Sequence, residues 1–137
     1  MKLNTVFLAD HGSVREGTLG VLGGFVNQLH RGEFPASMGV DLVAIATTVS
    51  EEIGEGEATD AFHFWCGEPG VDEPLFEGRG EIVSTFGHGR QTHFPMVFDL
   101  RNAMIPNPGQ FIINFRLNDG EVHSFPFWAE TPPTQAG

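Results

Sequence analysis

The feature that most constrains the fold is the regular interruption of short apolar runs by glycine and proline. The chain has 137 residues with 18 glycines and 9 prolines, and these are spread along the sequence instead of gathering in one linker. No segment keeps the 3.6-residue apolar period of a helix, so a helical domain is not expected. Short strands separated by turn residues at regular intervals are typical of antiparallel sandwiches and barrels. The sequence therefore predicts an all-β fold.

The strand pattern is clearest at residues 106–129. Every second residue from Phe111 to Leu117 is apolar, which predicts a strand with one face on a core. The turn Pro106–Gly109 precedes this strand, and Asn118-Asp119-Gly120 follows it with the residues of a tight hairpin turn. Applied along the whole chain, the same signals predict eight strands, at residues 3–10, 19–30, 40–49, 57–66, 75–85, 93–100, 110–117 and 121–129.

These strands predict one antiparallel β-sandwich over residues 1–129, in an immunoglobulin- or C2-like arrangement. Residues 130–137 are polar and contain two prolines, so we expect a flexible C-terminal tail. The segment Val40–Val49 is apolar on both faces and rich in β-branched residues, as expected of a central strand. An apolar strand of this kind can also pair with another copy of the chain.

The charge balance excludes several classes of partner. Seven Lys and Arg residues against 18 Asp and Glu residues give a formal net charge of −11. A phosphate backbone or an anionic lipid surface would be repelled, so we expect neither nucleic-acid nor membrane binding. The N-terminus lacks the apolar run of a secretory signal. The single cysteine can form no internal disulfide, and we expect a cytoplasmic location.

Two of the six histidines, His88 and His93, form the tightest candidate pair for a metal. Their odd spacing puts them on opposite faces of a regular strand, so they converge only if a turn separates them. With His63 as a possible third ligand, they could hold iron, zinc or manganese in a cupin-like double-stranded barrel. The cupin pattern of His-x-His followed by glutamate is absent, however. We therefore expect no cofactor, and a metal-dependent enzyme is the alternative.

No other group of residues indicates catalysis. Asp10, His11 and Ser13 are neighbours in one segment, whereas the members of a catalytic triad converge from separate parts of the chain. Cys66 has only His63 near it in sequence, and that residue faces away, so we expect a small buried hydrophobe instead of a reactive thiol. The glycines of Gly17–Gly24 are not followed by the Gly-Lys-Ser/Thr of a P-loop. We predict no catalytic residue.

Aromatic side chains are the best candidates for a binding surface. Most of the 13 phenylalanines are expected in the core, because one exposed face could not display so many. The run Phe125-Pro126-Phe127-Trp128 is denser than one core face needs. At least one of these rings is therefore expected at an edge or on a protein–protein surface. The candidate binding residues are Trp128, Phe127, Phe125 and Trp65.

Two segments carry a resemblance to a known group of proteins. The opening FLADHGSVREGTLGVLGGFVNQL with the later Phe34-Pro35, and the closing NPGQFIINFRLNDG with FPFW, resemble an uncharacterised family of small bacterial and phage domains. The shared positions are turn glycines and apolar core positions. The resemblance implies a small antiparallel sandwich and transfers no catalytic residue.

These observations predict a non-enzymatic binding or assembly module that acts through its loops or a sheet edge. We expect its partner to be another protein or a second copy of itself, and we expect it to form a homo-oligomer. A third possibility is a carrier of a small apolar ligand held between the sheets by phenylalanine side chains. Such a carrier would copurify with its ligand.

Overall fold

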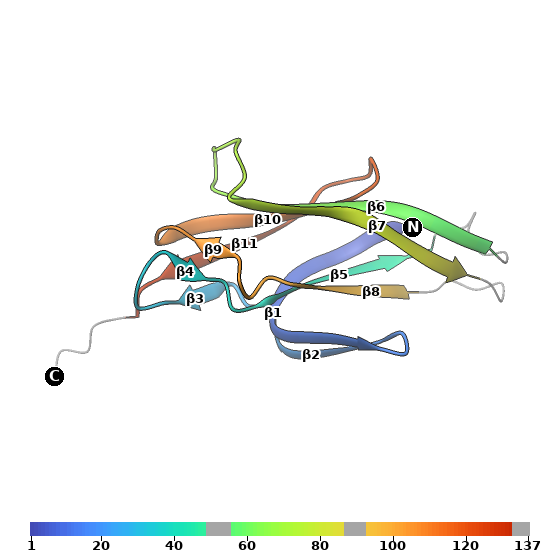
Figure 1. The fold of residues 1–137 in the computed structure, drawn as a ribbon, viewed down its shortest axis with the longest axis horizontal. Coiled ribbons are helices and arrows are strands. Elements are labelled where there is room, and N and C mark those ends of the chain that lie inside the picture. Colours follow the sequence, from blue (N-terminus) through green and yellow to red (C-terminus); the bar gives the residue numbers. More distant parts are fainter. Residues whose placement is uncertain (49–55, 87–92, 133–137) are drawn as a thin grey trace.

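The computed structural model describes residues 1–48, 56–86 and 93–132 (Figure 1). Within these residues the chain is all-β, as predicted, and no helical segment there has the length and hydrophobicity of a membrane span. Eleven strands are present in the described part: β1 (Lys2–Arg15), β2 (Thr18–Gly24), β3 (Gln28–His30), β4 (Ala36–Ser37), β5 (Asp41–Thr47), β6 (Gly56–Gly67), β7 (Phe76–Phe86), β8 (His93–Asp99), β9 (Met104–Ile105), β10 (Gly109–Leu117) and β11 (His123–Glu130).

The strand count exceeds the eight predicted for two reasons. The segment predicted as one strand over residues 19–30 divides into β2 and β3, because Gly23 and Phe25 adopt positive φ angles of 60° and 59° and turn the chain between them. The short strands β4 and β9 pair with each other and were not predicted. Two-residue strands leave no alternating pattern long enough to recognise in a sequence.

The strands form two larger sheets and one small one. The four-stranded sheet has the order β2-β1-β5-β8, the five-stranded sheet has the order β3-β11-β10-β6-β7, and β4 pairs with β9. All pairs are antiparallel except β3 with β11, which is parallel, so the prediction of a fully antiparallel fold is wrong at this edge. There β3 follows the first hairpin and lies beside the last strand. Backbone hydrogen bonds such as Trp128 N–H to the Asn27 carbonyl, at 2.8 Å, hold that pairing.

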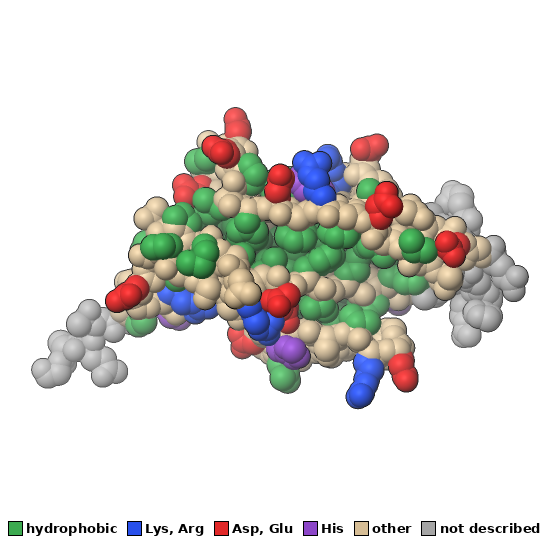
Figure 2. All heavy atoms as spheres, viewed as in Figure 1, with side chains coloured by type: hydrophobic (Ala, Val, Ile, Leu, Met, Phe, Trp, Pro, Cys, Tyr) green, Lys and Arg blue, Asp and Glu red, His purple; other side chains and the backbone are tan. Residues whose placement is uncertain are grey.

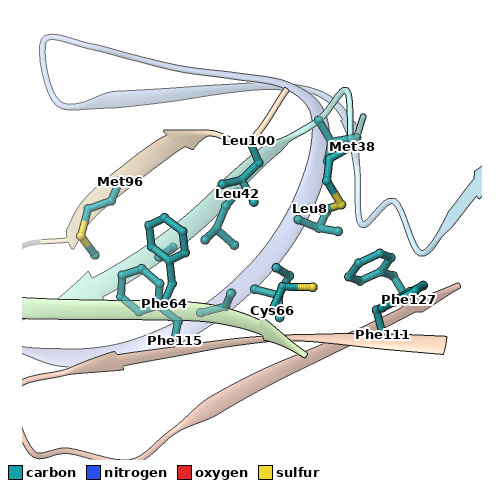
Figure 3. Packing of buried hydrophobic residues seen from close by; sticks show 14 of the residues in the cluster. Leu8, Met38, Leu42, Phe64, Cys66, Met96, Leu100, Phe111, Phe115 and Phe127 are labelled. Carbon is teal, nitrogen blue, oxygen red and sulfur yellow. The ribbon is translucent and has the colours of Figure 1, made fainter. Parts of the chain in front are cut away.

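The main core lies between the two larger sheets. Leu8 and Leu42 of the four-stranded sheet point toward Phe111, Phe115 and Phe127 of the five-stranded sheet (Figure 3), and all five side chains are fully buried. The predicted alternation from Phe111 to Leu117 is confirmed, since the apolar members of that run are buried and the residues between them are not. Burial of these apolar surfaces is the main source of folding free energy.

Two glycines of β7 make room for aromatic rings in this core. Gly78 lies opposite Phe64 and Gly80 lies opposite Phe62 in the pairing of β6 with β7. A Cβ atom on Gly78 would lie 2.3 Å from the Phe64 ring, and one on Gly80 would lie 2.7 Å from the Phe62 ring. Any larger side chain at either position would displace these rings, so the glycines are required by packing. Phe62 and Phe64 in turn contact Phe98 of β8, with ring centroids 4.9 and 5.2 Å away.

The outer face of the four-stranded sheet is covered by the chain itself. Strand β1 was predicted to end at residue 10, but it runs on to Arg15, and the β1–β2 hairpin lies beneath β5 and β8 (Figure 1). A second buried cluster of Phe7, Ala9 and Val43 forms there. At Gly12 a Cβ atom would lie 3.2 Å from methyl groups of both Val43 and Val97. Because of this cover, β5 is apolar on both faces without any partner molecule.

A charged cluster anchors the covering hairpin to β5. The Asp41 carboxylate is buried, and its Oδ2 accepts a hydrogen bond from the Gly12 N–H at 2.8 Å. Arg101 forms an ion pair with the same carboxylate and donates a second hydrogen bond to the Asp10 carbonyl at 2.9 Å. Hydrogen bonding to Asp41 raises the pKa of Arg101, so the guanidinium stays charged. This cluster joins β1, β5 and the segment after β8.

Candidate functional site

The four aromatic residues proposed for binding differ in solvent exposure according to their position in the strands. Along β11, alternate side chains face opposite sides: Phe127 is fully buried in the core, whereas Trp128 is 41% exposed on the outer face of the five-stranded sheet. Phe127 therefore cannot contact a partner while the chain is folded. Phe125 is half-buried, with its ring centroid 6.4 Å from that of Phe25. Trp65 is half-buried on the same outer face as Trp128, so the two tryptophans share this exposed face.

The three histidines of the metal hypothesis are not brought together within the described residues. His63 lies on β6, on the outer face of the five-stranded sheet, because its neighbours Phe62 and Phe64 point into the core. His93 lies on β8 of the other sheet and its Nδ1 is 3.0 Å from the Thr47 hydroxyl. His88 lies outside the described residues. Among the described side chains there is no group of three His, Cys, Asp or Glu residues that could hold a metal.

The single thiol is a core group, as expected. Cys66 is fully buried and lies on the opposite side of β6 from His63. Burial, with a smaller contribution from the charge of Glu68, raises the pKa of the Cys66 thiol to about 12. A thiol with such a pKa is almost entirely protonated at neutral pH and is a poor nucleophile.

A row of basic side chains crosses the outer face of the five-stranded sheet. Arg116 of β10 lies opposite His63 of β6, and His63 lies opposite Arg79 of β7. We call these three residues the basic row. Figure 2 shows Lys, Arg and His side chains gathered on this face, with acidic side chains on both sides of them. The grouping stands out in a chain that carries only seven Lys and Arg residues.

The members of the basic row differ in what they contact. His63 Nε2 lies 3.0 Å from a Glu77 carboxylate oxygen, and its ring stacks on Trp65 with centroids 4.5 Å apart. Arg79 Nη2 lies 3.8 Å from the same Glu77 carboxylate. The hydrogen bond with His63 is the main cause that lowers the pKa of Glu77, with a smaller effect of Arg79. Arg116 Nε is buried and has no hydrogen-bond partner among the described residues.

An open hollow of about 410 Å³ adjoins the basic row. The basic row forms one side of it, and Glu81 and Asp119 stand at its rim. The lining includes the small residue Ala61, which is exposed on the outer face and leaves the space beside it open. The full lining consists of Ala61, Phe62, His63, Arg79, Gly80, Glu81, Arg116, Asn118 and Asp119.

Strand β7 presents the longest free edge in the described part of the molecule. The two larger sheets end at β2, β8, β3 and β7, which have 7, 7, 3 and 11 residues. Beside β7, a band of hydrophobic side chains is visible between this strand and β8 (Figure 2). Partly buried residues of the core in this region include Phe62, Ile82 and Phe98.

Reasoning from the sequence missed the basic row and the β7 edge. The alternation from Phe111 to Leu117 already put Arg116 on the face opposite the core. The alternation does not identify the residues beside Arg116, because His63 and Arg79 belong to strands far away in the sequence. A sequence pattern gives the face of a side chain but not the register between distant strands.

Comparison with known proteins identifies a family without assigning a role. The model of a family of unknown function, DUF6941, matches residues 4–130. No curated protein matches the sequence significantly. An uncharacterised family is what the resemblance implied, whereas a bacterial or phage origin stays a prediction.

Proposed function

Because this chain belongs to the DUF6941 family, whose function is unknown, we propose its function from its own surfaces: it is a non-enzymatic assembly module that pairs with a second copy of itself along β7. The two larger sheets, with their shared core, form the β-sandwich that carries this edge. The observation that supports the proposal most directly is the order of side chains along β7, which is complementary to itself when the strand is reversed.

The other edges of the larger sheets are less suited to pairing. Strand β8 contains Pro95, which has no N–H to donate to a neighbouring strand. Strand β2 includes Gly23 in a positive-φ conformation, and β3 has only three residues. Strand β7 has no proline, so its outward-directed backbone groups are available to a new strand.

The side chains of β7 favour one register with a second copy. In antiparallel pairing centred on Gly80, Arg79 lies opposite the partner's Glu81, and Glu81 lies opposite the partner's Arg79. Two opposite-charge pairs then form across the twofold axis. On the core-facing side, Ile82 lies opposite the partner's Gly78. The large Ile82 side chain is accommodated there because glycine has no side chain. The paired segment extends from residue 76 to residue 84.

The apolar band between β7 and β8 supports the same partner. Exposed apolar surface at the flank of a sheet commonly marks an interaction site. A twofold axis perpendicular to the five-stranded sheet brings the β8 side of one copy toward the β8 side of the other. The two bands would then face each other and lose water contact together, which adds a hydrophobic contribution to the strand pairing.

The test is a charge exchange within the proposed interface, followed by native mass spectrometry and analytical ultracentrifugation. The native chain is expected at twice its 14.9 kDa mass. Arg79→Glu and Glu81→Arg each replace both attractive pairs with like-charge pairs, so each is expected to weaken the dimer about tenfold or more. The double variant Arg79→Glu/Glu81→Arg restores complementarity and is expected to restore the dimer.

Arg15→Glu is the matched control, because Arg15 is exposed at the end of β1 and the substitution changes the net charge by the same amount as Arg79→Glu. It is expected to leave the dimer unchanged. A monomeric native chain at every concentration would disprove self-association. Failure of the double variant to recover the dimer would disprove this register.

A further inference from the structure

We propose that the basic row and its hollow bind a carboxylate group, held between Arg116 and His63. The hollow shares Arg79 and Glu81 with the proposed β7 interface, but its central residue, Arg116, lies on β10 and is separated from the β7 edge by β6, so a substitution at Arg116 tests the site without changing β7. The ligand class follows from three features: an unpartnered arginine, an open space beside it, and the charges around that space.

Arg116 is the member of the basic row that lacks an acidic partner. Like charges directly opposite one another on neighbouring strands destabilise a sheet, and Arg116 lies opposite His63, which is positively charged only when it is protonated. Glu77 compensates the Arg79 end of the row, since its carboxylate contacts both His63 and Arg79. No acidic side chain among the described residues forms an ion pair with Arg116, and its buried Nε lacks an acceptor. The buried Nε is out of reach of a ligand in the hollow, so a bound anion would contact the terminal nitrogens of the Arg116 guanidinium, which are not among the buried unpaired atoms.

The hollow offers space for such a group and for the carbon atoms attached to it. Its volume of about 410 Å³ falls within the range of sites for small organic ligands. Ala61, directly beside His63 on the outer face, is too short to fill the space. Trp65, stacked on His63, provides an apolar surface on the other side of the row.

The surrounding charges favour a singly charged carboxylate over a phosphate. Glu81 and Asp119 at the rim, with Glu77 beside the row, would repel a dianion more strongly than a monoanion. The planar guanidinium of Arg116 matches the two oxygens of a carboxylate in a bidentate geometry. The net charge of −11 further disfavours a polyanion. The carboxylate could belong to a free organic acid or to the end of a peptide chain.

The test follows the Nε–Hε resonance of Arg116 by NMR while sodium acetate is added at constant ionic strength. We expect a saturable shift with a dissociation constant on the order of millimolar to tens of millimolar, the range for so small a ligand. Sodium chloride is the control for screening, and inorganic phosphate is the control for a dianion. Acetyl-diglycine and its C-terminal amide distinguish a peptide terminus from a free acid: tighter binding of the peptide acid than of acetate indicates a peptide.

Two variants complete the design. Arg116→Gln removes the guanidinium and is expected to abolish saturable shifts of the neighbouring His63 and Trp65 resonances. Arg15→Gln removes an arginine on the other sheet and is expected to leave them unchanged. Thermal unfolding of Arg116→Gln verifies that the variant folds, and its mass verifies that the dimer persists, so the two proposals fail separately. A linear shift with no saturation, or a response to phosphate equal to that for acetate, would overturn the carboxylate site.

Discussion

The outer faces of the two larger sheets differ in what lies over them. On the four-stranded sheet, the β1–β2 hairpin folds back over β5 and β8, and Val43 is fully buried beneath it. On the five-stranded sheet, the corresponding face carries the basic row, Trp65 and an exposed Trp128. Both faces belong to sheets that share one core on their inner sides.

The difference shows that apolar character on both faces of a strand is not by itself evidence of a partner. The two apolar faces of Val40–Val49 suggest pairing with another copy, but the chain itself covers both faces of β5. The outer face of the five-stranded sheet has no such cover in the described residues, and it carries charged side chains together with Trp65 and the exposed Trp128. A search for binding should therefore concentrate on that face and on the β7 edge.

The largest loss of stability is expected when a larger side chain replaces Gly12 on the covered face of the four-stranded sheet. Gly12→Val adds a side chain where a Cβ atom alone already lies 3.2 Å from Val43 and Val97. Overpacking of this kind is expected to lower the free energy of unfolding by about 3 kcal/mol. Strand propensity predicts the opposite sign, since valine is favoured in strands, so the measurement distinguishes packing from propensity.

Ala61→Val is the control for Gly12→Val on the other face. Ala61 is exposed on β6, so the larger side chain has space. We expect the free energy of unfolding, measured with urea, to change by no more than about 0.5 kcal/mol. A loss at Ala61 as large as that at Gly12 would show that the two outer faces are equally packed.

A smaller loss in the free energy of unfolding is expected when the Asp41 carboxylate, which anchors the β1–β2 hairpin to β5, is removed. Asp41→Ala takes away the acceptor of the Gly12 N–H, at 2.8 Å, and leaves that donor without a partner. We expect a loss of about 2 kcal/mol, the typical penalty for an unsatisfied buried donor. Asp99→Ala is the control: Asp99 lies 3.7 Å from the Arg101 guanidinium and accepts a hydrogen bond from the Arg101 N–H at 2.9 Å, but its side chain is 69% exposed. An equal loss in both variants would assign the effect to Arg101 instead of to the buried anchor.

The smallest effect on stability is expected from protonation of Glu77, on the uncovered face of the five-stranded sheet. The hydrogen bond with His63 lowers the pKa of Glu77 below its ordinary value of 4.5. A carboxylate with a lowered folded-state pKa stabilises the fold above its unfolded pKa, and that stabilisation is lost as the pH falls through the folded value. Because Glu77 is exposed, the effect on stability is expected to be slight. Carbon NMR of the Glu77 carboxyl should show the lowered pKa in the native chain and a return toward the ordinary value in His63→Gln. An unchanged titration in His63→Gln would contradict this pairing.

Much of the fold could be predicted from local patterns, and most of the candidate site could not. The strand at residues 110–117, its hairpin turn and its core face were all predicted, because alternation and the Asn118-Asp119-Gly120 turn are local signals. Asn118 adopts the positive φ of 50° that such a turn needs. The basic row needed the register of β10 with β6 and of β6 with β7, and the first of these joins residues far apart in sequence.

Local sequence patterns are sufficient to establish that the chain is all-β, where most strands lie, and which side chains of each strand face the same way. Those properties follow from the two-residue repeat of a strand and from turn residues, both of which act over a few positions. Contacts between distant segments are needed to establish that β1 runs past residue 10 to cover β5 and that β3 joins β11 in parallel. The same holds for the row of Arg116, His63 and Arg79. Strand pairing depends on hydrogen bonds and packing between distant segments, and no short stretch of sequence contains that information.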